Sequence, residues 1–245
     1  ARVSALPVDR IAGRLTDRFR LLTGGDQTAL PRQQTLRAMI DWSHDLLGEP
    51  ERALLRRLSV FAGGWTLEAA EAVCAGAGLD EADVLDLLSR LVDKSLVAMD
   101  ADGQRYRLLE TVREYARAKL EESGESDAVR TRHLHHYLAL AEAARPELNG
   151  PRRSEWLERL DVERENLLGA HAWAGRAENG AEAGLRLTYA LGSYWFMRGQ
   201  PELGLQLSIE ALARQGAQAR TAARCRALYD AGQHYCFTGR YEQAQ

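Results

Sequence analysis

The stretch LVDKSLVAMDADGQRYRLLE, residues 91–110, decides the fold class because its periodicity changes from helix to strand and back. A short apolar run at 96–99 leads into the turn sequence DADG. On the return, Tyr106 and Leu108 alternate with Arg105 and Arg107. The pattern predicts a β-hairpin. It is the only convincing β-structure that the sequence indicates.

Helical periodicity surrounds this hairpin on both sides. Apolar residues spaced by about one turn predict a helix over 33–47, a second helix that opens near Pro50, and a third over 67–75 with Thr66 as its N-cap. A further helix, capped by Asp80 or Asp83, precedes the hairpin, and the helical period resumes at 109 and runs to Gly124. Helices, then a hairpin, then a further helix within about 90 residues predict a winged-helix domain over 31–125.

Beyond residue 126 the sequence predicts helices alone, so the fold class is mostly α with one hairpin. Residues 185–204 align with 225–244 at an offset of 40. The pairs that coincide are Arg186/Arg226, Tyr189/Tyr229, Gly192/Gly232, Gly199/Gly239 and Glu202/Glu242. The order of small residue, aromatic residue and turn glycine resembles the tetratricopeptide repeat (TPR). We therefore expect a TPR-like helical domain over 126–245, truncated at its end, in a natural protein that continues.

Composition and motifs indicate no catalytic site. The chain has 245 residues, a net charge of −3, no run of 18 apolar residues and three scattered cysteines, which predicts a cytoplasmic protein without a membrane span. The only Lys–Ser pair, Lys94–Ser95, lacks the glycines of a phosphate-binding loop. His133 and His136 lack further ligands at metal-site spacing, so we expect them on a partly exposed helix face. We expect no enzyme activity, metal or cofactor in this chain.

The charge of the predicted helix before the hairpin bears on DNA binding. Residues 80–93 carry five acidic side chains and a single arginine, Arg90. DNA phosphates would repel such a helix, whereas DNA-binding proteins neutralise several phosphates. We therefore expect the winged helix to contact protein. The alternative is that it binds DNA directly, with the repeats as a dimerisation or ligand-binding arm.

Five blocks resemble the region after the nucleotide-binding module in bacterial STAND regulators, the signal-transduction ATPases with numerous domains, and in particular the LuxR-like and SARP-like transcriptional regulators. The blocks are RFRLLTGG (18–25), LPRQQTLRAMIDWSHDLL (30–47), LLRRLSVFAGGWTLEAAEAVC (54–74), LLSRLVDKSLV (87–97) and YRLLETVREYA (106–116).

The resemblance implies an NB-ARC-type ATPase upstream, which binds ATP or ADP and whose helical subdomain ends within residues 1–30. It further implies a winged helix that closes on bound ADP as a lid. The TPR region would then sense a protein, a peptide or a small-molecule effector, and exchange to ATP would open the parent for assembly.

The resemblance also implies candidate site residues. The Met-His-Asp motif of related NB-ARC switches falls on Leu108, Leu109 and Glu110, so leucine replaces the histidine and excludes a phosphate contact by this side chain. Arg113 is a candidate interdomain contact, with an ordinary helix-surface arginine as the alternative. The TPR register implies a cationic and aromatic groove formed by Arg186, Tyr189, Ser193, Phe196, Met197, Arg226, Tyr229, Gln233, Cys236 and Phe237. A generic repeat surface is an equally good interpretation of these positions.

Overall fold

The computed structural model describes residues 31–239, with side chains from residue 37 onward. The predicted end of an ATPase subdomain at 1–30 lies outside the described residues. The first half contains α3 (Pro31–Asp45), α4 (Glu49–Leu58), α5 (Leu67–Cys74), η1 (Glu81–Asp83), α6 (Val84–Asp93), β1 (Val97–Met99), β2 (Tyr106–Leu108) and α7 (Glu110–Glu122). The second half contains α8 (Ser126–Glu147), α9 (Arg153–Val162), α10 (Arg164–Ala174), α11 (Gly180–Met197), α12 (Pro201–Ala213) and α13 (Ala222–Phe237).

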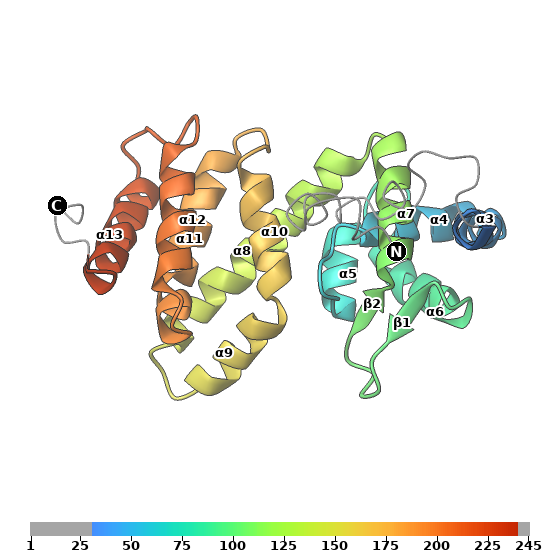
Figure 1. The fold of residues 1–245 in the computed structure, drawn as a ribbon, viewed down its shortest axis with the longest axis horizontal. Coiled ribbons are helices and arrows are strands. Elements are labelled where there is room, and N and C mark those ends of the chain that lie inside the picture. Colours follow the sequence, from blue (N-terminus) through green and yellow to red (C-terminus); the bar gives the residue numbers. More distant parts are fainter. Residues whose placement is uncertain (1–30, 240–245) are drawn as a thin grey trace, which may run out of the picture.

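The two halves lie side by side, and α8 runs between them (Figure 1). Helices α3 to α7 and the hairpin form one half, whereas α9 to α13 stack into the other. The predicted fold class, a winged helix with a hairpin followed by packed helices, is confirmed. No helix of the described residues is both long enough and apolar enough to cross a membrane.

One residue of the loop before α5 pairs with the two-stranded hairpin through an isolated β-bridge. Strands β1 and β2 pair antiparallel, with Val97 opposite Leu108 and Met99 opposite Tyr106. Trp65 then exchanges two backbone hydrogen bonds with Tyr106, at 2.8 and 2.9 Å. A Cβ at the neighbouring Gly64, where φ is +106°, would lie 2.7 Å from the Tyr106 carbonyl oxygen. Only glycine lets this loop approach the hairpin of β1 and β2 so closely. We call this hairpin the wing.

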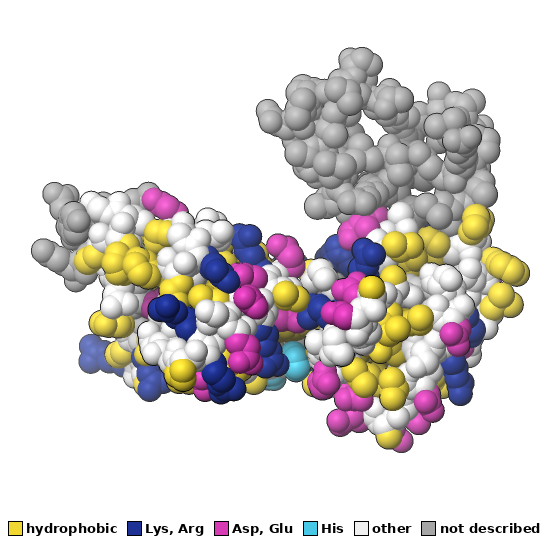
Figure 2. Space-filling view, turned by 90° about the horizontal axis from the view of Figure 1, so that it is seen from below, with side chains coloured by type: hydrophobic (Ala, Val, Ile, Leu, Met, Phe, Trp, Pro, Cys, Tyr) yellow, Lys and Arg dark blue, Asp and Glu magenta, His cyan; other side chains and the backbone are white. Residues whose placement is uncertain are grey.

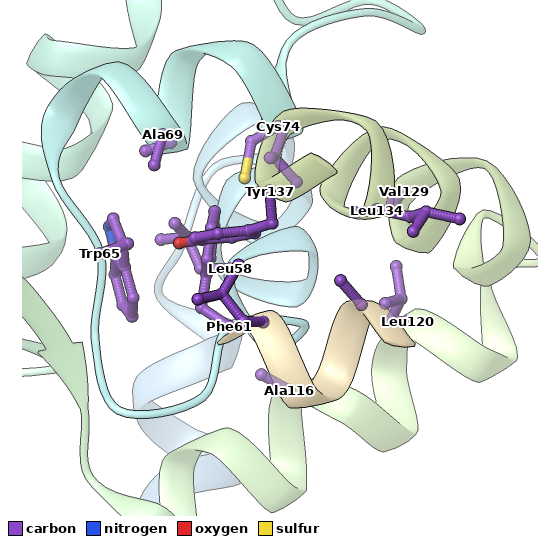
Figure 3. Close-up of a cluster of buried hydrophobic side chains, with 14 of the residues drawn as sticks. Leu58, Phe61, Trp65, Ala69, Cys74, Ala116, Leu120, Val129, Leu134 and Tyr137 are labelled. Carbon is purple, nitrogen blue, oxygen red and sulfur yellow. The ribbon is translucent and has the colours of Figure 1, made fainter. Parts of the chain in front are cut away.

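One hydrophobic core joins the winged helix to α8. Figure 3 shows Leu58, Phe61, Trp65, Leu120 and Tyr137 converging from several elements. The Phe61 ring stacks on Trp65 with centroids 5.3 Å apart, and Tyr137 of α8 meets the same Phe61 ring edge-on at 6.4 Å. The core therefore crosses the predicted domain boundary at 125/126. The boundary itself stays a prediction.

A buried arginine supports the turn between α5 and α6. The side chain of Arg57 on α4 is 1% exposed and donates to the carbonyl oxygens of Cys74, Gly76 and Ala77 at 2.6 to 3.1 Å. It also pairs with Glu125 at 2.7 Å. Thr66 caps α5 by accepting a hydrogen bond from the Ala69 amide, as predicted. The turn is thus held by side chains from outside it.

Within the helical half, α11 packs against α8, α12 and α13. Gly199 and Gly239, predicted to be equivalent turn glycines, follow α11 and α13 and have φ of +67° and +74°. Their shared conformation fits the 40-residue offset in the sequence. Membership of the TPR family stays a prediction.

Candidate interaction surfaces

The outer face of α6 is acidic. Its inner residues Val84, Leu88 and Leu91 are buried, so Asp86 and Asp93 are left on the solvent side. The residues just before α6, Asp80 to Asp83, are also exposed and carry three more carboxylates. Figure 2 shows acidic side chains on the winged-helix half and many basic side chains, all of them arginines, on the helical half. The helix that a DNA-binding winged helix would insert into the major groove thus has a repulsive surface.

The arginines of the wing are engaged by carboxylates. Arg105 forms an ion pair with Glu163, which is buried between α9 and α10. Arg107 lies 3.7 Å from Asp100 on the opposite side of the hairpin. The wing is therefore tied to the helical half through Arg105 and offers little unpaired positive charge.

Asn166 on α10 completes this connection, and we call Arg105, Tyr137, Glu163 and Asn166 the joint. The Asn166 amide nitrogen donates to the Gly64 carbonyl oxygen at 2.9 Å and to Glu163 at 2.8 Å. Its oxygen accepts from the backbone N–H of Ala62 at 2.7 Å. The Tyr137 hydroxyl donates to Glu163 at 3.0 Å. The buried side-chain amide of Asn166 thus binds both the loop that pairs with the hairpin and the carboxylate that holds Arg105.

His133 lies beside the joint, which corrects the expectation of a partly exposed helix face. The residue is 4% exposed, and its Nε2 lies 3.4 Å from the Asn166 oxygen. Burial lowers the pKa of His133 to about 4, although the contact with Asn166 acts in the opposite direction. The ring is therefore neutral at pH 7. In the described residues, no group of three or more His, Cys, Asp or Glu side chains could hold a metal ion.

The residues at the Met-His-Asp-like position lie where β2 meets α7. Leu108 ends β2 and is half-buried, whereas Leu109 precedes α7 and is 53% exposed. Glu110 pairs with Arg113 at 2.6 Å within the first turn of α7. This pair agrees with an ordinary helix-surface arginine, whereas an exposed leucine at the end of a strand is a surface available to another domain.

The structure brings Arg186, Tyr189 and Arg226 together, as the repeat register implied. They line a pocket of about 260 Å³ between α8, α11 and α13, which we call the arginine pocket. Two further charged residues of this pocket, Glu142 and Arg145, come from α8. Sequence reasoning missed them because α8 shows no match to the 40-residue repeat.

The remaining predicted groove residues lie outside the arginine pocket. Tyr229, Gln233, Cys236 and Phe237 line a second hollow on α13. The other three belong to α11, where Phe196 is exposed and contacts Phe237, Ser193 is half-buried, and Met197 packs against the main core.

Comparison with known proteins agrees with the observed arrangement of helices and hairpin. The winged helix-turn-helix domain family matches residues 47–121. The chain contains a winged helix-turn-helix domain. No solved structure matches the chain significantly.

The chain is also homologous to larger regulators. It is 47% identical over 238 residues to proteins named "Putative HTH-type transcriptional regulator" in Mycobacterium tuberculosis (strain H37Rv) and Mycobacterium bovis. The alignment covers 94% of this chain but 26% of each relative. An uncharacterized protein of Mycobacterium tuberculosis is 49% identical over 142 residues, which is 56% of this chain and 35% of that protein. The chain thus spans about a quarter of the length of these regulators.

Proposed function

We propose that this chain is the winged-helix and sensor segment of a STAND-type, ATP-dependent transcriptional regulator and has no catalytic activity of its own. The winged helix serves as an interdomain lid on an upstream NB-ARC module, where ATP or ADP binds. The helical half receives a protein, peptide or small-molecule effector. The observation that carries the proposal is the acidic outer face of α6, which suits a contact with protein and not with DNA.

The joint supports a lid that moves as one body with the sensor. Arg105 and the Trp65 loop are held by α10 through Glu163 and Asn166. A shift of the helical half would therefore carry the wing with it. Coupling by such a packed, hydrogen-bonded element is what a switch between two domain arrangements requires.

The alternative, direct DNA binding through the winged helix, is favoured by the domain family and by the names of the relatives. Fluorescence anisotropy of the chain with labelled duplexes from about 50 to 200 mM salt tests it. We expect no binding even at the lowest salt. Tight binding with a steep salt dependence would overturn the proposed role of the winged helix.

Charge reversal on α6 makes this test sharper. In the double variant Asp86→Lys, Asp93→Lys, the local charge rises by four, so salt-dependent DNA binding is expected to appear at about 50 mM salt. The matched control is Glu155→Lys, Glu158→Lys, which makes the same change on exposed positions of α9. Equal binding by both variants would show that the acidic face of α6 is not what prevents DNA binding.

Leu109 provides a second test, in the longer protein that the proposal requires. Because Leu109 is exposed, Leu109→Asp should change the unfolding free energy of the chain by no more than about 0.5 kcal/mol. In the longer protein it should accelerate ADP release, measured with a fluorescent ADP analogue, because a charge replaces an apolar lid contact. Met99→Asp, at an equally exposed apolar position on the hairpin, is the control. Unchanged ADP release in the Leu109 variant would contradict the lid contact.

A further inference from the structure

We propose that the arginine pocket binds a small organic acid. Its carboxylate contacts Arg186 and Arg226, and its short apolar body lies against Pro146, Ala190 and Ala223. The inference deepens the proposed sensor role, on which it rests, by naming the class of effector.

Of the arginines that line the pocket, Arg145 is held by other groups of the protein, whereas Arg226 is available to bind a ligand. The Arg145 guanidinium lies 3.5 Å from the centre of the Tyr189 ring and donates to the Tyr189 carbonyl oxygen, so this arginine is held in place. It also lies 3.8 Å from the buried Asp230. Arg226 approaches the same ring at 5.7 Å and is exposed. Among the described residues no carboxylate forms an ion pair with Arg226. Its guanidinium can therefore bind an incoming anion.

Glu142 shows how a carboxylate binds in this pocket. Its two oxygens accept hydrogen bonds from Nε and Nη2 of Arg186, both at 2.7 Å, in the bidentate geometry that a planar carboxylate favours. Both side chains are about 40–45% exposed, and such exposed pairs contribute little stability. An incoming acid that also reaches Arg226 would gain a second cation and displace Glu142 from Arg186.

The size and lining of the pocket limit the ligand. About 260 Å³ lies slightly below the range of roughly 300–1,000 Å³ for drug-sized ligands. Pro146, Ala190 and Ala223 contribute apolar surface, and Tyr189 also lines the pocket. This lining favours a carboxylate attached to a compact apolar body over a free inorganic ion.

The experiment is a titration of the chain with benzoate, followed by ligand-observed NMR. Benzamide, which has the same shape without the charge, and inorganic phosphate are titrated in parallel. We expect benzoate to bind and both comparison compounds to bind at least about tenfold more weakly, because hydrogen bonds to an ionised group are the stronger ones and the pocket is lined by apolar groups. Equal binding of benzamide would exclude carboxylate recognition, and equal binding of phosphate would reduce the pocket to an inorganic anion site.

Two substitutions with opposite expected effects test whether benzoate binds in the arginine pocket. Arg226→Gln should weaken benzoate binding about tenfold, since it removes a charge-assisted contact. Glu142→Gln should strengthen it up to about fivefold, since it removes the internal competitor for Arg186. Arg153→Gln, an exposed arginine on α9, is the matched control and should have no effect. Circular dichroism melting confirms that each variant folds.

The result is independent of the DNA test. Absence of benzoate binding in both the unaltered chain and the Glu142→Gln variant, or the same affinity in the Arg226→Gln variant, would overturn the pocket assignment and leave the lid proposal standing. DNA binding by the chain would overturn the lid proposal and leave benzoate binding at the pocket unaffected.

Discussion

Replacing Arg57 with alanine is expected to lower the free energy of unfolding by about 3–5 kcal/mol, the typical result of removing one partner from a buried ion pair. The substitution would leave three carbonyl oxygens of the α5–α6 turn and the Glu125 carboxylate without the guanidinium that binds them. Urea unfolding followed by circular dichroism measures the change.

Arg56 is the matched control, because it is adjacent and also pairs with Glu125, at 2.9 Å. Its side chain is more exposed, and its other partner, Glu49, lies at the surface. Arg56→Ala should therefore cost about 1 kcal/mol or less. A loss in Arg57→Ala no larger than that in Arg56→Ala would show that the buried guanidinium does not hold the turn.

The pH dependence of stability tests the same cluster. Burial of the Glu125 carboxylate acts to raise its pKa, but hydrogen bonds from Arg57 and Arg56 outweigh it and lower the pKa to about 2, against an ordinary value of 4.5. The unfolded chain therefore binds the proton more readily, and the contribution of Glu125 is complete above pH 4.5 and decreases as the pH falls toward 2. In Arg57→Ala this acid dependence should become shallower.

Local patterns in the sequence were sufficient to predict the winged helix. The change of period at 96–108 predicts the hairpin, and Thr66 at the start of an apolar pattern predicts the N-cap of α5. Both signals act between residues close in the sequence. Arg186 and Arg226, predicted to be equivalent groove positions at the 40-residue offset, line the same pocket.

The joint could not be predicted, because its contacts join residues far apart in the sequence. Asn166 lies 104 positions from Ala62, and Arg105 lies 58 positions from Glu163. Nothing in the local pattern distinguishes these polar side chains from exposed ones. The expectation for His133 was wrong for the same reason: its burial depends on the loop around Phe61 and on α10, not on its own helix.

The largest effect in the joint is expected for Asn166→Ala, which should lower the free energy of unfolding by about 3 kcal/mol or more. The substitution leaves the Ala62 N–H and the Gly64 carbonyl without their side-chain partner and removes one of the two hydrogen bonds to Oε2 of Glu163, which keeps the one from Tyr137. Each unsatisfied buried group costs about 1–3 kcal/mol. Asn149→Ala, at an exposed position after α8, should change stability by no more than about 0.5 kcal/mol. Comparable losses in the two variants would contradict the assigned role of Asn166.

Two further measurements test whether Asn166 couples the wing to the helical half or only contributes to the overall stability of the protein. Hydrogen exchange of the Tyr106 amide, which donates to Trp65 across the wing, should accelerate more in Asn166→Ala than exchange within α11, because the Trp65 loop loses its anchor. A double-mutant cycle with Arg105→Gln should show a coupling energy above about 0.5 kcal/mol, because Arg105 and Asn166 both bind Glu163. Uniform acceleration of exchange and additive energies would mean that the wing and the helical half are not coupled through this site, and a lid that responds to the sensor would then need another connection.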